Sequence, residues 1–267
     1  MRKIVPFLLI LLWTGPTWAV GDADFFKMIE QGDVAGVKSA LAEGWDLNAG
    51  DDFSGTTPLM RAVIEEQSEI VELLLSAGAD PDALSSNGLA PLERALMFRL
   101  PGSDTKIMEL LIEAGADLET RDSNYAGTTL LFHPAERGDT QTTRLLLKAG
   151  AVSEANARGL TPLHLATGLM AMEMEGRNTG TFSERAARAC PGSDFSGTAR
   201  ALVEAGADVD AVCMGLEEPD MPEGLKKILE PFGGKTPLDF ARTLGNQEVA
   251  AYLEGVGART AAELQKR

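Results

Sequence analysis

Histidine and cysteine, which many catalytic and metal sites use, are scarce in this chain. Its 267 residues include only two histidines, His133 and His164, and two cysteines, Cys190 and Cys213. No pair among these four residues has the close spacing of a zinc finger or a zinc ribbon. No serine or cysteine stands in a recognisable nucleophile elbow with a residue to orient its base. We therefore expect no catalytic residue and no metal site.

Phosphate-binding loops are also missing. The Gly-Lys-Thr at 234–236 resembles part of a Walker loop, but that loop needs a further glycine where Leu229 stands and a strand before it. The acidic clusters at 51–52 and 217–220 lack the alternating ligands and central glycine of a calcium loop. We expect no bound cofactor.

Positive charge is in short supply. The chain has 24 lysines and arginines against 40 aspartates and glutamates, so its net charge is −16. Like charges repel, and this argues against nucleic acid and anionic membrane surfaces as partners. The same charge favours a basic protein partner, although it also serves solubility.

Long apolar runs are absent except near the start of the chain. Basic residues at 2–3 precede the apolar run 4–13, and Ala19 then offers a small residue for cleavage. A membrane-spanning helix needs about 20 apolar residues, twice the length of this run. We interpret residues 1–19 as a signal peptide. The mature chain, 20–267, is then expected in the periplasm or outside the cell, without membrane insertion.

A phrase close to Gly-x-x-Pro-Leu recurs along the mature chain. Its copies begin at Gly55, Gly88, Gly127, Gly159 and Gly234. A second glycine follows three of these starts at an offset of 23 residues, and the same offset counted back from Gly44 reaches Gly21. The sequence therefore predicts six units, which begin near 21, 55, 88, 127, 159 and 234.

The unit that begins at Gly55 shows how each unit should fold. Thr57 can cap a helix whose first residue is Pro58, because proline fits the first turn. A second apolar stretch at 70–75 predicts another helix, which Gly78 ends. Two short helices cannot bury their apolar faces alone, so the units are expected to stack and share one core.

These units resemble the ankyrin repeat. The best copy, Gly159 to Ala166, matches the family signature T-P-L-H-x-A with a glycine before it. The resemblance implies an all-α solenoid of about six helix-turn-helix units, and we expect the secreted or periplasmic bacterial type. It also implies that His164 bonds to the backbone of an adjoining repeat.

Two units depart from the family pattern. The fourth has Leu130 in place of the signature proline and carries Pro134 inside its first helix, where it should kink or shorten that helix. The interval from the fifth start to the sixth is 75 residues, against 32 to 39 for the others. The fifth unit fits only with two insertions, near 168–197 and 209–233.

The resemblance further implies a protein partner bound on the concave face, which the inter-repeat turns and first helices form. The candidate contact residues on these elements are Phe53, Met60, Arg61, Glu93, Phe98, Tyr125 and Arg158. Exposed aromatic side chains would supply contact area, with packing inside the turns as the alternative role.

Two other functions stay open at this point. One is an immunity or inhibitor protein that neutralises a basic effector. The other is a copper- or redox-linked accessory protein. It rests on the pair Cys190 and Cys213 and on three methionines, Met170, Met172 and Met174, which are soft ligands of the kind that suit Cu(I). On a helix, Met172 would point away from the other two, which favours core packing.

Cys190 and Cys213 are expected to form a disulfide, because their number is even and the predicted compartment is oxidising. A helix near 198–205 separates them and spans about 12 Å. A disulfide needs Cα atoms about 4.4–6.8 Å apart. The bridge therefore requires the first insertion to fold back along that helix, and two separate thiols are the alternative.

Overall fold

The computed structural model describes residues 22–48, 50, 55–97, 99–122, 127–169, 181–214 and 232–266. The expected signal peptide lies outside these ranges, and so do Met170, Met172 and Met174. Among the helices in these ranges, none combines the length and apolar character that a membrane crossing requires.

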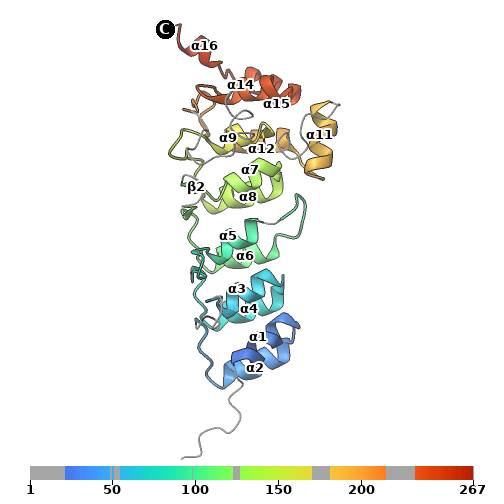
Figure 1. Ribbon diagram of the computed structural model, residues 1–267, viewed down its shortest axis with the longest axis vertical. Coiled ribbons are helices and arrows are strands. Elements are labelled where there is room, and N and C mark those ends of the chain that lie inside the picture. The colour runs from blue at the N-terminus through green and yellow to red at the C-terminus, as the bar shows by residue number, and fades with distance from the viewer. Residues whose placement is uncertain are drawn as a thin grey trace, which may run out of the picture.

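Within the described residues, the helices form six pairs that stack along one axis (Figure 1). The pairs are α1 (Asp22–Glu30) with α2 (Val34–Ala42), α3 (Pro58–Ile64) with α4 (Ser68–Ser76), α5 (Pro91–Met97) with α6 (Lys106–Glu113), α7 (Phe132–Arg137) with α8 (Thr140–Ala149), α9 (Pro162–Leu165) with α12 (Phe195–Glu204), and α14 (Pro237–Leu244) with α15 (Gln247–Gly255). The predicted all-α repeat solenoid is confirmed.

Two further helices and a pair of short strands lie outside the six helix pairs. Helix α11 (Phe182–Ala189) lies in the first insertion and projects from the side, and α16 (Ala261–Leu264) follows the last pair (Figure 1). A short antiparallel ladder pairs β1 (Arg121–Asp122) with β2 (Thr128–Thr129) at the turn between units three and four.

Threonine and proline start the first helices as the sequence predicts. The Thr57 side chain accepts a hydrogen bond from the Met60 N–H at 3.2 Å, with Pro58 as the first residue of α3. Thr161 and Thr236 cap α9 and α14 in the same way, and their helices also begin with proline. Each cap satisfies an N–H that has no partner inside the helix.

Helix α7 has no such cap, and it is short, which is one of the two outcomes expected from Pro134. Leu131 stands at the N-cap without a side-chain hydrogen bond, and the helix has six residues. Pro134 falls in its first turn, where the missing N–H needs no partner within the helix. The helix therefore begins late enough to accommodate Pro134 and is short rather than kinked.

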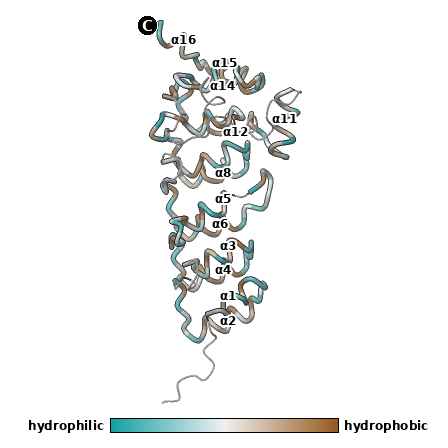
Figure 2. Tube along the Cα trace, in the orientation of Figure 1, coloured by the Kyte–Doolittle hydropathy of each residue, from teal (hydrophilic) through white to brown (hydrophobic). Residues whose placement is uncertain are grey.

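The apolar core runs without a break through the whole stack. First helices pack on first helices from α1 to α14, and second helices pack from α2 to α6 and from α8 to α15. Fully buried side chains recur in both rows, among them Phe25, Ile29, Leu59, Ile70, Leu74, Leu92, Leu111, Leu131 and Phe240. Figure 2 shows apolar segments in the helices and hydrophilic stretches in the loops beside them.

The seam between units three and four combines little contact between the second helices with a charged side chain that bridges the units. Helices α6 and α8 touch less than the neighbouring second helices do. The Arg137 guanidinium crosses the seam and donates to the main-chain oxygens of Leu96, Met97 and Arg99 at the end of α5. A cation at a helix C-terminus interacts favourably with the helix dipole.

The loop between α5 and α6 of unit three and the first insertion of unit five meet on the side of the helix-to-helix turns (Figure 1). A Cβ built on Gly192 would lie 3.2 Å from the Pro101 carbonyl oxygen, so the two loops are in close contact. The Asp194 N–H also donates to the Gly138 carbonyl of unit four at 2.7 Å.

The predicted disulfide between Cys190 and Cys213 is not formed, and both buried cysteines are separate thiols. Cys190 ends α11, close to Arg137 at the helix-to-helix turns. Cys213 exchanges backbone hydrogen bonds with the loop before α14, at Gly234 and Lys235. The prediction was wrong because the described end of the first insertion, 181–197, contacts unit four, where the Asp194 N–H donates to the Gly138 carbonyl, instead of folding back along α12.

Candidate protein-binding surface

An aspartate recurs where each of four units leaves its second helix. Asp46, Asp80, Asp117 and Asp208 each accept, through Oδ1, the backbone N–H two residues further on, at 2.9–3.0 Å. Aspartate favours this local turn because its short side chain reaches the following backbone. Four carboxylates are thereby held in equivalent positions, and all four residues are exposed.

Hydrogen bonds between units keep these positions aligned. Asn48 Oδ1 accepts from the Asp80 N–H at 3.1 Å, and Asp82 Oδ1 accepts from the Asp117 N–H at 2.8 Å. Asp210 Oδ1 accepts from the Arg259 N–H at 2.8 Å. We define the acidic edge as Asp46, Asp80, Asp117 and Asp208, which stand in the inter-unit loops after α2, α4, α6 and α12. Figure 1 shows these loops along one side of the stack.

The electrostatics of the acidic edge favour cations. Helices α2, α4, α6 and α12 end just before it, so the negative ends of their dipoles lie near the carboxylates. Val152 interrupts the row in unit four and is 37% exposed. Arg259 stands at the equivalent place in unit six. Partial burial opposes ionisation of Asp210, but the hydrogen bonds and charge of Arg259 outweigh it and lower the pKa of Asp210.

Two of the predicted contact residues are buried, and their assignment was wrong. Met60 is 2% exposed and Glu93 is 3% exposed. Both are the third residue of a first helix, α3 and α5. Because they are buried, these side chains cannot form part of the surface that a partner meets.

The remaining predicted contact residues fall into two groups. Arg61 is half-buried on α3 and forms long ion pairs with Glu30 at 3.8 Å and Glu65 at 3.9 Å. Arg158 is half-buried in the turn before α9, and its carbonyl accepts from the Met214 N–H at 2.8 Å. Three aromatic candidates lie outside the described residues, namely Phe53, Phe98 and Tyr125.

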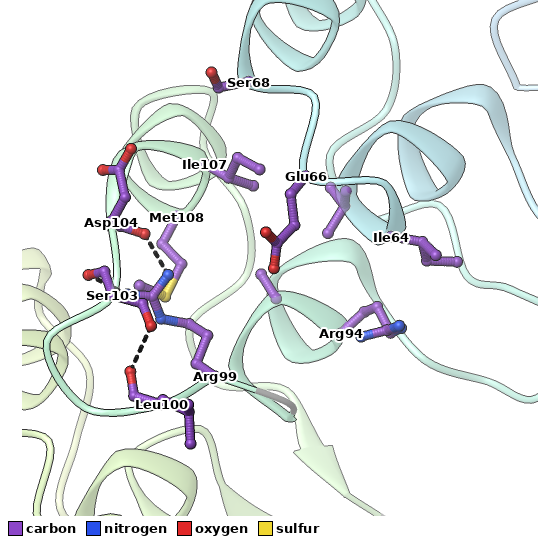
Figure 3. Close-up of a pocket in the computed structure, with 12 residues that line it drawn as sticks. Ile64, Glu66, Ser68, Arg94, Arg99, Leu100, Ser103, Asp104, Ile107 and Met108 are labelled. Atoms are coloured by element: carbon purple, nitrogen blue, oxygen red, sulfur yellow. Dashed lines mark hydrogen bonds between the residues drawn. The ribbon is translucent and has the colours of Figure 1, made fainter. Parts of the chain in front are cut away.

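A pocket of about 360 Å³ lies between units two and three, on the side of the helix-to-helix turns (Figure 3). Its walls come from α3, α4, α5, α6 and the loop that joins α5 to α6. Arg99 holds that loop by donating to the carbonyl oxygens of Ser103 and Asp104, and Ser103 Oγ donates to the Leu100 oxygen at 2.8 Å. The long interval between the third and fourth units was the sequence signal for this loop.

Glu66 lines the pocket in a strained backbone conformation. Its φ is +54°, whereas Gly32, Gly138 and Gly245 take positive φ at the corresponding turns of other units. A left-handed conformation costs a residue with a Cβ about 1–2 kcal/mol. Figure 3 shows the Glu66 carboxylate pointing into the pocket. A strained residue beside a pocket is a reason to suspect a functional role.

His164 has the structural role that the family resemblance implies. Its Nδ1 accepts from the Thr161 N–H at 3.1 Å, and its Nε2 then donates to the Lys235 carbonyl of the next unit at 3.3 Å. Burial lowers the pKa of His164 to about 4, against the raising effect of its backbone hydrogen bonds. In the described parts of the chain, no three metal-ligating side chains form a cluster that could bind a metal.

Comparison with known proteins decides the family. A family model described as ankyrin repeats (3 copies) matches residues 25–122 and 95–172, which together are more than half of the chain. The chain belongs to the ankyrin-repeat family. The ankyrin-repeat fold is generally a non-catalytic scaffold for protein–protein interaction, and the repeats imply a protein–protein interaction module in this chain.

The curated relatives match this chain over segments that are short relative to their own length. The chain is 44% identical over 70 residues to the 2-5A-dependent ribonuclease of Mus musculus, a match that covers 26% of this chain and 10% of that protein. The matched segments span between 7% and 18% of the length of the curated relatives.

Solved ankyrin structures align with most of the chain. An ankyrin repeat domain from Acinetobacter baumannii is 25% identical with a TM-score of 0.65, and the alignment covers 90% of this chain and 100% of that one. A chain from the Bdellovibrio bacteriovorus complex of a predatory endopeptidase with an immunity protein is 26% identical. Its TM-score is 0.58, with 86% of this chain and 96% of that chain covered.

Proposed function

We propose that this ankyrin-repeat protein is a periplasmic or secreted module that binds a basic protein partner through the face formed by its inter-repeat turns. The observation that carries the proposal is the acidic edge, in which local turns and inter-unit hydrogen bonds hold exposed aspartates in register. A partner with basic residues at a matching spacing would meet several carboxylates at once. The net charge of −16 adds long-range attraction.

Such binding depends on charge and on salt. Exposed charges are screened beyond about 8 Å at physiological ionic strength. Rim charges therefore act mainly on the association rate and on the choice of partner. The predicted turn aromatics Phe53 and Tyr125 would supply the apolar contact that the acidic edge lacks.

A second, narrower function is inhibition of a secreted enzyme or toxin. It is supported by the similarity to a chain from the endopeptidase–immunity protein complex of Bdellovibrio bacteriovorus, which extends over 86% of this chain. Under this proposal the partner is an enzyme whose activity falls when the acidic edge is occupied. The copper-linked alternative loses its cysteine pair, because Cys190 and Cys213 lie in different parts of unit five.

Cross-linking in intact cells, followed by mass spectrometry, would identify the partner. Binding of the purified partner is then compared between Asp80→Asn/Asp117→Asn and Glu69→Gln/Glu72→Gln. Asparagine keeps the Oδ1 acceptor of each turn, and both double variants remove the same charge. Glu69 and Glu72 are exposed on α4, away from the acidic edge.

We expect only the Asp80→Asn/Asp117→Asn variant to slow association, and the difference to disappear at high salt. If the two variants slowed association equally, the acidic edge would contribute only through the net charge of the protein. No effect of either would place the binding surface elsewhere. If the partner is an enzyme, its inhibition should weaken in parallel with binding.

A further inference from the structure

A cleft of about 170 Å³ separates the projecting helix α11 from the body of the stack. Its lining comes from α11, from the loop that follows it, and from the first turns of α12 and α15, and comprises Phe182, Ala186, Ala187, Gly192, Ser193, Asp194, Phe195, Ser196, Asn246 and Glu248. The volume corresponds to roughly six water molecules, enough for one extended side chain. The cleft exists because of the first insertion of unit five.

Two aromatic rings form the apolar wall of this cleft. Phe182 and Phe195 meet edge to face, with ring centroids 5.8 Å apart and an angle of 68° between their planes. A Cβ on Gly168 would lie 2.2 Å from Phe182, and one on Gly138 would lie 3.1 Å from Phe195. Glycine at these two sites leaves room for the rings, because a Cβ there would approach them too closely.

The charged groups of the cleft are all acidic. Among its described lining residues, Asp194 and Glu248 are charged and none is basic. Asp194 caps α12, where its Oδ1 accepts from the Gly197 N–H at 2.7 Å. Glu248 is exposed in the first turn of α15. The two carboxylates therefore belong to neighbouring helices that pack side by side and frame one opening.

We propose that this cleft receives an arginine side chain of the protein partner. The aliphatic stem would pack on Phe182 and the exposed Ala187, as long basic side chains do on apolar surface. The planar guanidinium is attracted to the face of an aromatic ring and to carboxylates. Lysine should bind more weakly, because its compact ammonium is more strongly hydrated and cannot stack. An acidic side chain would be repelled.

The inference deepens the proposed function, on which it rests for the source of the arginine. It assigns a recognition role to the first insertion, which projects from the stack on the side of the helix-to-helix turns (Figure 1). The partner would then contact two separate acidic regions, one at the inter-unit loops and one beside α11. Contacts at two places favour one orientation of the partner.

The test uses the whole mature protein and three short peptides, acetyl-Gly-Arg-Gly-amide and its lysine and glutamate counterparts. Alanine methyl groups are labelled, and NMR follows Ala186 and Ala187 at low ionic strength as each peptide is added. The expected result is saturable shifts with the arginine peptide, weaker binding of the lysine peptide and no binding of the glutamate peptide.

Asp194→Asn/Glu248→Gln should weaken binding of the arginine peptide by about tenfold or more, since two charge pairs are lost. Asparagine caps a helix as well as aspartate, so α12 should stay intact. Glu69→Gln/Glu72→Gln carries the same change in net charge and should bind like the unmodified protein.

The proposal is overturned if the arginine peptide gives no saturable shift, if Asp194→Asn/Glu248→Gln binds it unchanged, or if the glutamate peptide binds equally well. The experiment needs no partner protein. If the arginine peptide does not bind in the cleft, the proposal for the acidic edge is therefore unaffected. If the acidic edge variants bind the partner as the unmodified protein does, the proposal for the cleft is likewise unaffected.

Discussion

The Arg137 guanidinium donates a 2.8 Å hydrogen bond to the main-chain oxygen of Leu96, and so ties unit four to the end of α5 in unit three. The oxygens of Met97 and Arg99 accept from the same group. One side chain thus satisfies several carbonyls that α5 leaves without helical partners. It does so at the seam where α6 and α8 make little contact.

Replacing Arg137 should therefore destabilise the stack. Arg137→Met keeps much of the apolar stem but removes the charged donors, so carbonyls at a partly buried helix end lose their partner. We expect a loss of about 2 kcal/mol in the free energy of unfolding, measured by urea denaturation. Arg144→Met, on the exposed face of α8, should change stability by less than about 0.5 kcal/mol. Equal losses would contradict the bridging role.

Glu66→Gly should stabilise the protein. Glycine relieves the positive φ of Glu66, and part of the gain is offset by greater freedom of the unfolded chain, leaving about 0.5–1 kcal/mol. Glu65→Gly is the matched control, because Glu65 has a helical φ of −85° and should lose stability instead. If Glu66 contributes to partner binding at the pocket, the Glu66→Gly protein should also bind the partner more weakly. Unchanged binding would mean that Glu66 acts only in the turn.

Acid should destabilise the protein through His164. Its pKa falls from 6.5 in the unfolded chain to about 4 in the folded protein, so the unfolded chain takes up the proton first. Stability is complete above pH 6.5 and is lost as the pH falls towards 4, by about 2 kcal/mol near pH 5. Three carboxyl groups, those of Asp210, Glu184 and Glu263, also have lowered pKa values. Because their ordinary pKa values are 3.8 to 4.5, these groups reduce the stability at pH values lower than those at which His164 acts.

Urea denaturation at several pH values between about 5 and 8 measures this loss. His164→Gln should be less stable at neutral pH, because the ring contacts are lost, but its stability should vary little across the same range. A variant with the same pH dependence as the unmodified protein would assign the effect to another group.

Both cysteines should react as thiols. Cys190 and Cys213 are buried, and burial raises the pKa of Cys190, so labelling of the folded protein should be slow. In denaturant without a reducing agent, two labels per chain are expected by mass spectrometry. If the chain took up no label until it was reduced, the disulfide prediction would be correct after all.

The mature protein should begin at Val20, because the apolar run is short and Ala19 offers a cleavage site. Intact mass of the exported protein measures the N-terminus directly. Full-length chain in the membrane fraction would contradict both the signal peptide and the assigned compartment.

Local features of the fold were predictable because they depend on adjacent residues. Thr57-Pro58 starts α3 as expected, and a glycine with positive φ, such as Gly78, ends the second helices. His164 bonds to Lys235 of the next unit although a long insertion separates the two residues in sequence. Both residues belong to copies of the repeat signature, which sets their positions. These signals recur with each unit and need no knowledge of distant contacts.

The exposure of individual residues and the packing of the insertions were not predictable in the same way. Met60 and Glu93 sit on first helices, but which side of such a helix faces solvent depends on how the neighbouring unit packs. The segment around Cys190 has no repeat to fix its place, so nothing in the sequence reveals that Gly192 meets Pro101 from unit three. The cleft beside α11 has the same origin.

The contact between Gly192 and Pro101 passes over unit four, and this changes how the stack can come apart. In a simple solenoid each unit holds only its immediate neighbours, so the stability is close to a one-dimensional sum and fraying can begin at any boundary. Here units three and five also hold each other. Opening unit four requires that contact to break as well, so the middle of the stack should behave as a three-unit block and unfolding should proceed from the two ends.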